Sequence, residues 1–406
     1  MELIADNGRK VTIEEVDTTR HLAHAQQQSQ KRKYEDMLIV DVDSHHHESS
    51  SYEDIFEFME SPVLKQITKA GRAVGRRSLM PNGLGYQDVA GRVTRYAMRG
   101  EKTPPGIHRD IVIGHRWMDA MGVDYACMFP TSMLNIGMHP ETDMEVELCW
   151  AYNRWLTEKI LPAGGGRIYS MLCLPFSDPE ACLKQVETFG GRKGVTGFMV
   201  TTVRHLPVHH NDYMKVYRAI EERGLSLSFH SGFNWMEPIF KTCNRFIAVH
   251  ALGFTVYNIL HLTNWVVNGL NERFPKLPVI WIEAGLAWVP FLMQRLDHEY
   301  MMRSSECPTL KKKPSEYMRD MYYSSQPIEL QNMKAVELTF EMINAETQLL
   351  YSSDYPHWDF DLPSTIHDLP FLTEKAKHNI LGGNAARLFN LPPRNPKQAE
   401  NMKKFA

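Results

Sequence analysis

The chain has 406 residues, of which 43% are hydrophobic and 23% are charged, and its formal net charge is −3. This length suits one large domain or two ordinary ones. The lysines and arginines are scattered along the chain rather than gathered into a basic stripe, so the composition excludes the usual footprint of a nucleic-acid-binding protein.

The six cysteines stand singly, several of them in apolar runs. This pattern indicates buried, reduced thiols in a cytoplasmic protein rather than a disulfide framework. The first 36 residues are polar and lack the apolar segment of a signal peptide. We expect no membrane-spanning helix, because the sequence is judged to contain no uncharged apolar run of the ~18 residues that such a helix requires.

Residues 1–36 are expected to form an N-terminal arm outside the core, which is either disordered or wrapped around a partner subunit. Eight apolar runs that are typical of buried strands follow, at residues 37–43, 123–129, 167–173, 194–200, 225–230, 278–283, 321–324 and 348–354. Helical patterns lie between and after them, at 141–160, 179–189, 211–223, 255–273, 286–302, 328–344 and 373–390.

Alternation of buried strands with helices predicts a parallel sheet covered by helices. Eight such units fit an α/β fold of the closed (β/α)8 TIM-like barrel type best, which we assign to residues 37–392, with a C-terminal tail at 393–406. Residues 44–122 are too long for one connecting helix, and Pro/Gly turns at 81–85 and 102–106 mark loops within them. We expect residues 60–115 to be an insertion over the barrel mouth, acting as a lid or a dimer element.

The active site of such a barrel lies at the C-terminal ends of its strands. Four strand ends carry residues that can bind a metal: Asp43 and His45 on the first, His230 on the fifth, Glu283 on the sixth and Asp354 on the eighth. Side chains at i and i+2 of a strand share a face, so Asp43 and His45 both point into the mouth and His46 does not. One such residue alone is usually a cap or a core hydrogen-bonding group. The set together predicts a site for Zn²⁺, Fe²⁺ or Mn²⁺ with a position left for water or substrate.

Six motifs between residues 38 and 391 resemble, in the same order, the amidohydrolase-related branch of the amidohydrolase superfamily. They are VDVDSH at 40–45 with Glu48, FHSG at 229–232, GLNERFP at 269–275, EAGLAWVP at 283–290, YSSDYPH at 351–357 and GGNAARL at 382–388. That branch includes non-oxidative decarboxylases of aromatic and related acids, and C–C and other hydrolases. Each motif alone is weak, but their combination is specific.

The resemblance implies that Asp43 and His45 are first-strand metal ligands, His230 the fifth-strand ligand and Asp354 the eighth-strand ligand. It also implies that Asp354 moves the proton, as base toward water or as acid toward a carbanion-like carbon. Asp43 stands where many relatives have His, and Glu283 stands where many decarboxylases have a catalytic His. Glu283 would replace that His as proton carrier, hold a second metal with Glu48, or orient His230 from behind.

Four further residues are weaker candidates, each with a structural alternative. His250 resembles a loop histidine of relatives with the EAG motif, and would be a base or an electrostatic stabiliser, or else a helix cap. His357 and Trp358 follow Asp354 in a tight loop and would form a wall of the substrate pocket, or only a turn. Arg204 follows the fourth strand and would hold a substrate carboxylate, or else make a surface salt bridge.

Three functions are weighed. The narrowly preferred one is a hydrolase whose metal-activated water attacks an ester, thioester, amide or activated C–C bond of a hydrophobic or aromatic carboxylate substrate, because Glu48 and Glu283 add carboxylates. The second is a decarboxylase of an aromatic or related acid, which family frequency favours. The third is a non-catalytic binding barrel, against which the retention of every ligand type argues.

The site predicts one divalent metal, with zinc as the first choice, iron or manganese as alternatives, and a second metal left open. We expect a small-molecule substrate and neither a nucleic-acid nor a membrane partner. We also expect a homodimer, because relatives commonly assemble as dimers and because the N-terminal arm would suit contact with a partner subunit.

Overall fold

Eight parallel strands form a barrel in the computed structural model, which describes residues 3–4, 10–11, 18–73, 104–201, 206–232, 237–357 and 359–405. The strands are β3 (Val40–His46), β4 (Tyr125–Pro130), β5 (Ile168–Cys173), β6 (Val195–Val200), β7 (Ser226–His230), β8 (Val279–Ile282), β9 (Tyr322–Ser324) and β10 (Leu349–Leu350). Each strand pairs in parallel with the next in chain order. The predicted (β/α)8 fold is confirmed. A separate antiparallel pair joins β1 (Leu3–Ile4) to β2 (Lys10–Val11).

The barrel closes between β3 and β10 through single backbone hydrogen bonds. Val42 N donates to Tyr351 O (3.0 Å), and Asp354 N donates to Asp43 O (2.8 Å). The sequence predicted a strand over 348–354, but β10 has only two residues. The strand ends early because the next two amides leave the ladder: Tyr351 N donates to Ile380 O (3.0 Å), and Ser352 N donates to the hydroxyl of Ser325 (3.0 Å).

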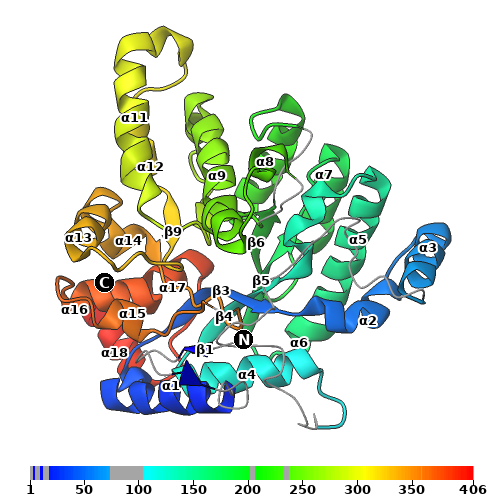
Figure 1. Ribbon diagram of the computed structural model, residues 1–406, viewed down its shortest axis with the longest axis horizontal. Coiled ribbons are helices and arrows are strands. Elements are labelled where there is room, and N and C mark those ends of the chain that lie inside the picture. Colours follow the sequence, from blue (N-terminus) through cyan, green and yellow to red (C-terminus); the bar gives the residue numbers. More distant parts are fainter. Residues whose placement is uncertain are drawn as a thin grey trace.

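Helices surround the barrel (Figure 1). They are α1 (Thr18–Arg32), α2 (Tyr52–Phe56), α3 (Pro62–Ala73), α4 (Arg109–Met121), α5 (Thr142–Trp155), α6 (Leu161–Ala163), α7 (Pro179–Phe189), α8 (Met214–Glu222), α9 (Phe246–Val267), α10 (Leu270–Arg273), α11 (Trp288–Arg303), α12 (Pro314–Met318), α13 (Met333–Met342), α14 (Ala345–Gln348), α15 (Ser364–His367), α16 (Glu374–His378), α17 (Asn384–Phe389) and α18 (Pro396–Phe405). A π-helical turn, η9 (Asn379–Gly383), joins α16 to α17, and 3-10 turns include η1 (Tyr34–Asp36), η2 (Glu48–Ser51) and η4 (Ser132–Met138).

The strands are buried on both faces, which explains why they read as continuous apolar runs. Every residue of β3, β4, β6, β7 and β8 is buried. The histidines of β3 and β7 lie at the C-terminal ends of these strands, at His45, His46 and His230. The hydrophobic interior therefore leaves the chemistry at one end of the barrel.

The segments that flank the predicted barrel carry helices of their own. Within residues 1–36, α1 packs along α4, and within residues 393–406, α18 packs on η1. Gln398 Nε2 of α18 donates to the carbonyl of Met37 (3.1 Å) and to Asp124 Oδ2 (3.0 Å). These contacts fasten the C-terminal helix to the entry into β3 and the entry into β4.

The predicted insertion at 60–115 is described only in part, because residues 74–103 lie outside the described residues. Its first described part is α3. Its last part forms the start of α4, which packs closely on the barrel. Gly114 of α4 lies so near β4 that an added Cβ would be 3.3 Å from the side chain of Met128. The end of the predicted insertion is therefore an ordinary barrel helix.

Helix α9 is longer and more apolar than the sequence analysis allowed. Its 22 residues contain no Asp, Glu, Lys or Arg, and its best 18-residue window has a mean hydropathy of 1.4. The expectation that no uncharged run reaches this length is therefore wrong at α9. One such helix is a weak indication of a membrane span, because core helices meet the same criterion, and Leu262 and Trp265 of α9 are buried in the barrel core.

Candidate metal centre

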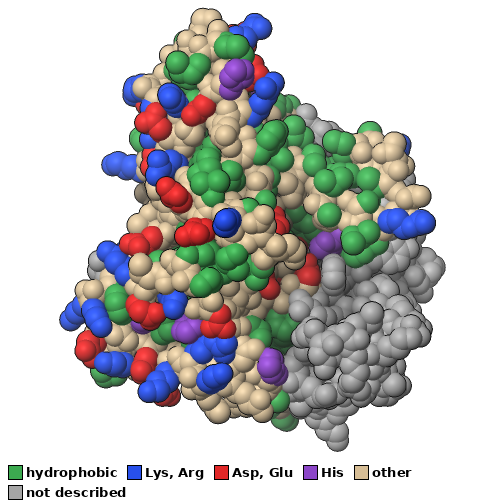
Figure 2. Space-filling view, turned by 60° about the vertical axis from the view of Figure 1, so that its left-hand side comes forward, with side chains coloured by type: hydrophobic (Ala, Val, Ile, Leu, Met, Phe, Trp, Pro, Cys, Tyr) green, Lys and Arg blue, Asp and Glu red, His purple; other side chains and the backbone are tan. Residues whose placement is uncertain are grey.

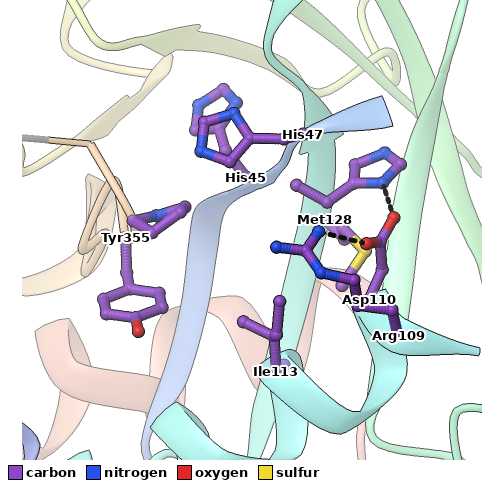
Figure 3. Close-up of a pocket in the computed structure, with 10 residues that line it drawn as sticks. His45, His47, Arg109, Asp110, Ile113, Met128 and Tyr355 are labelled. Atoms are coloured by element: carbon purple, nitrogen blue, oxygen red, sulfur yellow. Dashed lines mark hydrogen bonds and ion pairs between the residues drawn. The ribbon is translucent and has the colours of Figure 1, made fainter. Parts of the chain in front are cut away.

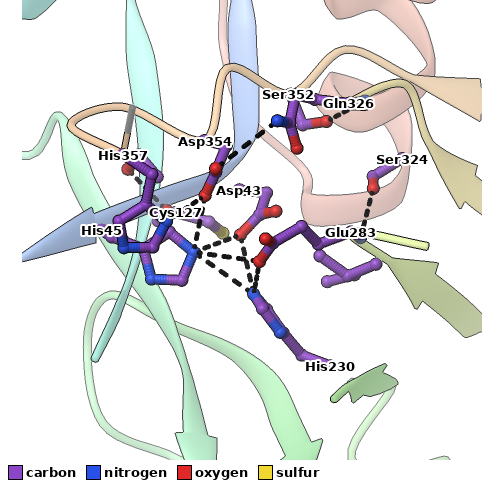
Figure 4. A network of polar contacts seen from close by, with 12 residues as sticks. Asp43, His45, Cys127, His230, Glu283, Ser324, Gln326, Ser352, Asp354 and His357 are labelled. Atoms are coloured by element: carbon purple, nitrogen blue, oxygen red, sulfur yellow. Dashed lines mark hydrogen bonds and ion pairs between the residues drawn. The ribbon is translucent and has the colours of Figure 1, made fainter. Parts of the chain in front are cut away.

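The four predicted ligands and Glu283 converge at the C-terminal end of the barrel (Figure 4). They come from four elements: Asp43 and His45 lie on β3, His230 ends β7, Glu283 follows β8 and Asp354 follows β10. All five side chains are buried. Residues more than 300 positions apart in the sequence are thus brought together because parallel strands of a barrel end at the same rim.

The contacts between the ligating atoms of this cluster run from 3.2 Å to 3.8 Å, the longest being between His45 Nε2 and Glu283 Oε2. His45 Nε2 lies 3.3 Å from His230 Nε2, and each of these nitrogens lies 3.2 Å from Asp43 Oδ1. Asp354 Oδ1 lies 3.2 Å from His45 Nε2, and Glu283 Oε2 lies 3.3 Å from His230 Nε2. Two atoms that are each about 2.1 Å from one cation, at a tetrahedral angle, stand about 3.4 Å apart. The spacing suits one divalent cation among the five side chains.

Backbone carbonyls orient both imidazoles toward this centre. His45 Nδ1 lies 3.0 Å from Pro130 O, and His230 Nδ1 lies 3.0 Å from Ser231 O. An Nδ1–H donated to a carbonyl leaves the lone pair on Nε2, which is the nitrogen that faces the cluster in both residues. The histidines are therefore held in the tautomer that binds a metal.

Two of the three carboxylates of the cluster, Asp43 and Glu283, have oxygens without hydrogen-bond donors in the part of the chain that the structure describes. Both oxygens of Asp43 and Oε2 of Glu283 are buried, and no donor among the described residues hydrogen-bonds to them. Burying a carboxylate without donors is costly unless a cation compensates for it. The donor set and these unsatisfied oxygens thus fit a divalent metal.

The electrostatics of the cluster favour an added positive charge. Burial and the neighbouring charges of Asp354 and Asp43 raise the pKa of Glu283 well above its usual value. Burial lowers the pKa of His45, but Asp43 and Asp354 outweigh it and raise that pKa to about 10. For Glu283 burial is the larger cause, whereas for His45 the neighbouring carboxylates produce the shift against burial. A cation at the centre would offset the buried negative charge.

His357 lies against this cluster, with both ring nitrogens occupied. Its Nδ1 is 2.6 Å from Asp354 Oδ1, and its Nε2 is 3.1 Å from the hydroxyl of Thr131. Its ring packs against that of His45 at a tilt of 32°, with centroids 4.2 Å apart. The sequence suggested His357 as a wall of the substrate pocket or only a turn; in the structure its ring contacts Asp354 and Thr131.

Glu48 faces the backbone rather than the cluster. Its two oxygens accept hydrogen bonds from Thr131 N (2.9 Å) and Met133 N (2.8 Å), at the end of β4 and in η4. Burial raises its pKa, and His46 and these two amides oppose that rise. The structure therefore separates Glu48 from Glu283, which the sequence had paired as candidate ligands of a second metal.

His250 lies inside α9, not in a loop. The sequence predicted a helix from residue 255, whereas α9 begins at Phe246 because its apolar pattern extends through residues 246–254. The ring of His250 packs against Phe246 and Phe254, and burial lowers its pKa to about 4.

A pocket lies beside the cluster, along the outer side of β3 (Figure 3). It encloses about 410 Å³, part of it open to solvent, and its lining includes His47, Arg109 and Tyr355. His46 also borders it and turns away from the cluster, with its Nδ1 2.8 Å from Asp110 Oδ2. Alternation along β3 thus sends His45 and His46 to opposite faces, as predicted. Arg204 and Trp358, the other predicted substrate contacts, lie outside the described residues.

Two residues that the sequence analysis did not select contact the site. Gln326 Nε2 lies 3.4 Å from Asp354 Oδ2, and the hydroxyl of Thr131 donates to His46 O (2.9 Å) while it contacts His357. Both residues follow strand ends, β9 and β4. Their signal in the sequence is the same as that of the metal ligands, because a polar side chain follows an apolar strand; here the polar group is an amide or a hydroxyl.

The model of the amidohydrolase family matches residues 42–391, and the chain belongs to this family. It is an enzyme of the metal-dependent amidohydrolase superfamily. Gamma-resorcylate decarboxylase of Polaromonas sp. (strain JS666) is 22% identical over 246 residues, which are 55% of this chain and 71% of the relative.

Solved structures share the fold. That of 5-carboxyvanillate decarboxylase from Sphingomonas paucimobilis has a TM-score of 0.63 at 21% identity and covers 88% of this chain and 100% of that chain. That of dihydroxybenzoic acid decarboxylase from Polaromonas sp. JS666, with bound manganese and the inhibitor 2-nitroresorcinol, has a TM-score of 0.60 at 16% identity and covers 89% and 99%.

These comparisons correct the function preferred from the sequence. Hydrolysis by metal-activated water is the wrong choice, because the similar proteins are decarboxylases. That choice depended on extra carboxylates at Glu48 and Glu283, yet the oxygens of Glu48 are occupied by backbone amides. A non-catalytic barrel is also excluded, because the chain belongs to a family of metal-dependent enzymes.

Proposed function

We propose that this protein is a metal-dependent, non-oxidative decarboxylase of a hydroxylated aromatic acid. The observation that carries the proposal is its similarity to gamma-resorcylate decarboxylase across most of that enzyme's length. The fold is also that of 5-carboxyvanillate decarboxylase and dihydroxybenzoic acid decarboxylase. The names of all three relatives describe hydroxylated aromatic acids as substrates, which is the basis for the substrate class.

Asp43, His45, His230, Asp354 and Glu283 would hold the metal, as their spacing supports. When bound, a divalent cation supplies positive charge that attracts the carboxylate and a neighbouring oxygen of the substrate. Glu48 binds backbone amides, which supports one metal rather than two. Three of the five donors are carboxylates, a set that suits Mn²⁺ as well as the Zn²⁺ predicted first, and a similar structure contains manganese.

Asp354 is the proposed proton carrier. The bond between the ring carbon and the carboxylate breaks, CO2 leaves, and the electron pair of that bond remains on the ring carbon. This carbon takes a proton from Asp354, which has first received it from the acid substrate or from water. His357 holds the orientation of Asp354 through the contact at 2.6 Å. Glu283, at the position where many decarboxylases carry a catalytic His, places a carboxyl group rather than an imidazole beside His230.

The test is product analysis in labelled water. The purified protein, loaded with Mn²⁺, would be incubated with 2,6-dihydroxybenzoate and 5-carboxyvanillate in D2O. The proposal predicts release of CO2 and one deuterium on the carbon that loses the carboxyl group. Turnover that instead placed ¹⁸O from labelled water in a product carboxyl group, without CO2, would overturn it, as would a protein that never releases CO2 from any hydroxylated aromatic acid of a wider panel.

We further propose a homodimer. Helices α9 and α11 expose large apolar side chains: Ile247 (73% exposed), Leu252, Leu260, Phe291, Met301 and Met302. Figure 2 shows such side chains among the charged ones on one face of the molecule. Large exposed apolar side chains on adjacent elements support a protein interface. Light scattering of the purified protein tests this, and a monomeric mass at micromolar concentration would contradict it.

A further inference from the structure

The strand β3 contains an irregularity just before the metal cluster. Asp41 pairs with Ala126, whereas Ser44 pairs with Met128, so β3 has one residue more than β4 between these points. Such a bulge leaves backbone groups without their ladder partners and re-aims the side chains that follow. Here the residues that follow are Asp43 and His45.

Asp41 supplies the missing partner at this bulge. The side chain is fully buried, and its Oδ1 accepts a hydrogen bond from Asp43 N at 3.0 Å. A side-chain oxygen that accepts from the amide two residues later fixes the local backbone. The direction in which Asp43 leaves the strand is therefore set by Asp41.

The same carboxylate also binds the segment that follows β10, across the junction where β3 and β10 close the barrel. Its Oδ1 accepts a second hydrogen bond from Ser353 N at 3.0 Å, and its Oδ2 accepts one from the Ser353 hydroxyl. The oxygen of that hydroxyl in turn accepts from Tyr355 N at 3.0 Å. Ser353 and Tyr355 flank Asp354 on both sides.

Asp354 needs such support because its backbone is in the left-handed region, with φ 59°. A non-glycine residue in this region costs on the order of 1 kcal/mol and persists where its surroundings hold it. The β3–β10 seam also has few backbone hydrogen bonds to do so. Asp354 N donates to Asp43 O, and His45 N donates to Tyr355 O at 2.7 Å.

We propose that Asp41 is a positioning residue, which sets the spacing between the carboxylates of Asp43 and Asp354 by joining the bulge of β3 to the loop after β10. It binds the backbone amide of Asp43 and, through Ser353, the segment that carries Asp354, so it acts on both ligands through the backbone. The inference rests on the proposed metal centre, and it assigns to Asp41 a role in metal affinity rather than in proton transfer.

The experiment measures Mn²⁺ binding by the metal-free full-length protein, by calorimetry and by competition with a chelator. Asp41→Ala is expected to weaken Mn²⁺ binding by 10- to 100-fold, which is the usual effect of removing a group that orients metal ligands. Asp41→Asn keeps an acceptor oxygen for the amides of Asp43 and Ser353, and is expected to restore binding to within about fivefold. Ser353→Ala is the milder variant, in case Asp41→Ala does not fold.

Asp124→Ala is the matched control. Asp124 is another mostly buried aspartate that bridges two segments, because its Oδ2 accepts from Ile39 N and from Gln398 Nε2, both at 3.0 Å. It lies near the start of β3, at the opposite end of the barrel. Asp124→Ala should lower the melting temperature but leave Mn²⁺ affinity unchanged.

The proposal is overturned if Asp41→Ala and Ser353→Ala lose only thermal stability, as Asp124→Ala does, and bind Mn²⁺ within threefold of the unaltered protein. It is also overturned if Asp41→Asn binds no better than Asp41→Ala. An unaltered protein that binds Mn²⁺ but releases no CO2 would remove the proposed decarboxylase activity and leave the role of Asp41 standing.

Discussion

His357 Nδ1 lies 2.6 Å from Oδ1 of Asp354, the same oxygen that lies 3.2 Å from His45 Nε2. The metal-facing oxygen of Asp354 is thus also the one that an imidazole holds. His357, three positions later in the chain, therefore orients Asp354, the proposed proton carrier.

Replacing His357 tests this role. His357→Phe keeps a ring beside His45 but loses both polar contacts, and we expect kcat for CO2 release to fall by about 10- to 100-fold with little change in KM. The exposed His210, 40% accessible at its side chain and paired with Asp212, provides the control His210→Phe. If kcat is equal in the two variants, His357 does not orient Asp354.

Removal of the metal should abolish activity and lower stability. A ligand that binds only the folded state at 100 times its Kd stabilises it by about 2.7 kcal/mol. Dialysis against a chelator is therefore expected to lower the melting temperature by several degrees, and Mn²⁺ to restore it together with CO2 release. His230→Ala should show the low melting temperature with or without Mn²⁺; a restoration in that variant would remove His230 from the metal site.

Glu283→Gln separates the charge of this side chain from its size. Its Oε2 lies 3.3 Å from His230 Nε2, and loss of the negative charge should weaken Mn²⁺ binding by about tenfold or more because a carboxylate ligand is lost. The control is Glu48→Gln, whose oxygens bind backbone amides outside the cluster. Titration of both variants with Mn²⁺ makes the comparison, and equal affinities would remove Glu283 from the ligand set.

The stability of the protein should depend on pH through Glu145 of α5. Burial raises its pKa to about 7 from the usual 4.5. The folded chain therefore keeps this proton between pH 4.5 and 7 while the unfolded chain releases it, so stability falls as pH rises through that window. The loss has an upper bound of about 3 kcal/mol. Urea unfolding of Glu145→Gln at pH 5 and pH 8 should show this pH-dependent part removed, and an unchanged pH dependence would contradict it.

The barrel seam should not tolerate a side chain at Gly382. A Cβ there would lie 2.0 Å from the carbonyl oxygen of Leu38, just before β3. Because the obstacle is backbone, Gly382→Ala is expected to destabilise the protein by about 3 kcal/mol or more. Gly191→Ala, where nothing lies within 4 Å of an added Cβ, should stay within about 0.5 kcal/mol. Chemical unfolding curves compare the two variants. Equal midpoints would show that the backbone at Leu38 can move to accommodate the added methyl group.

The sequence by itself determined the barrel and the identity of the ligand-bearing strand ends. Parallel strands that are buried on both faces consist mainly of apolar residues, so apolar runs that alternate with helical patterns reveal the strands and their order. The positions of Asp43, His45, His230 and Asp354 follow from those strand ends. The bounds of α7 match the predicted 179–189, whereas α8 begins three residues after and ends one residue before the predicted 211–223.

Only the tertiary structure decided what each polar group near the rim contacts. Glu48 and Glu283 look alike in sequence, yet one binds backbone amides and the other faces two imidazoles. His357, Thr131 and Asp41 acquire their roles from partners that are distant in the chain or set by a bulge in β3. Hydrophobic periodicity fixes which face of an element is buried, but the pairing of polar atoms depends on angles and distances between strands that no local pattern encodes.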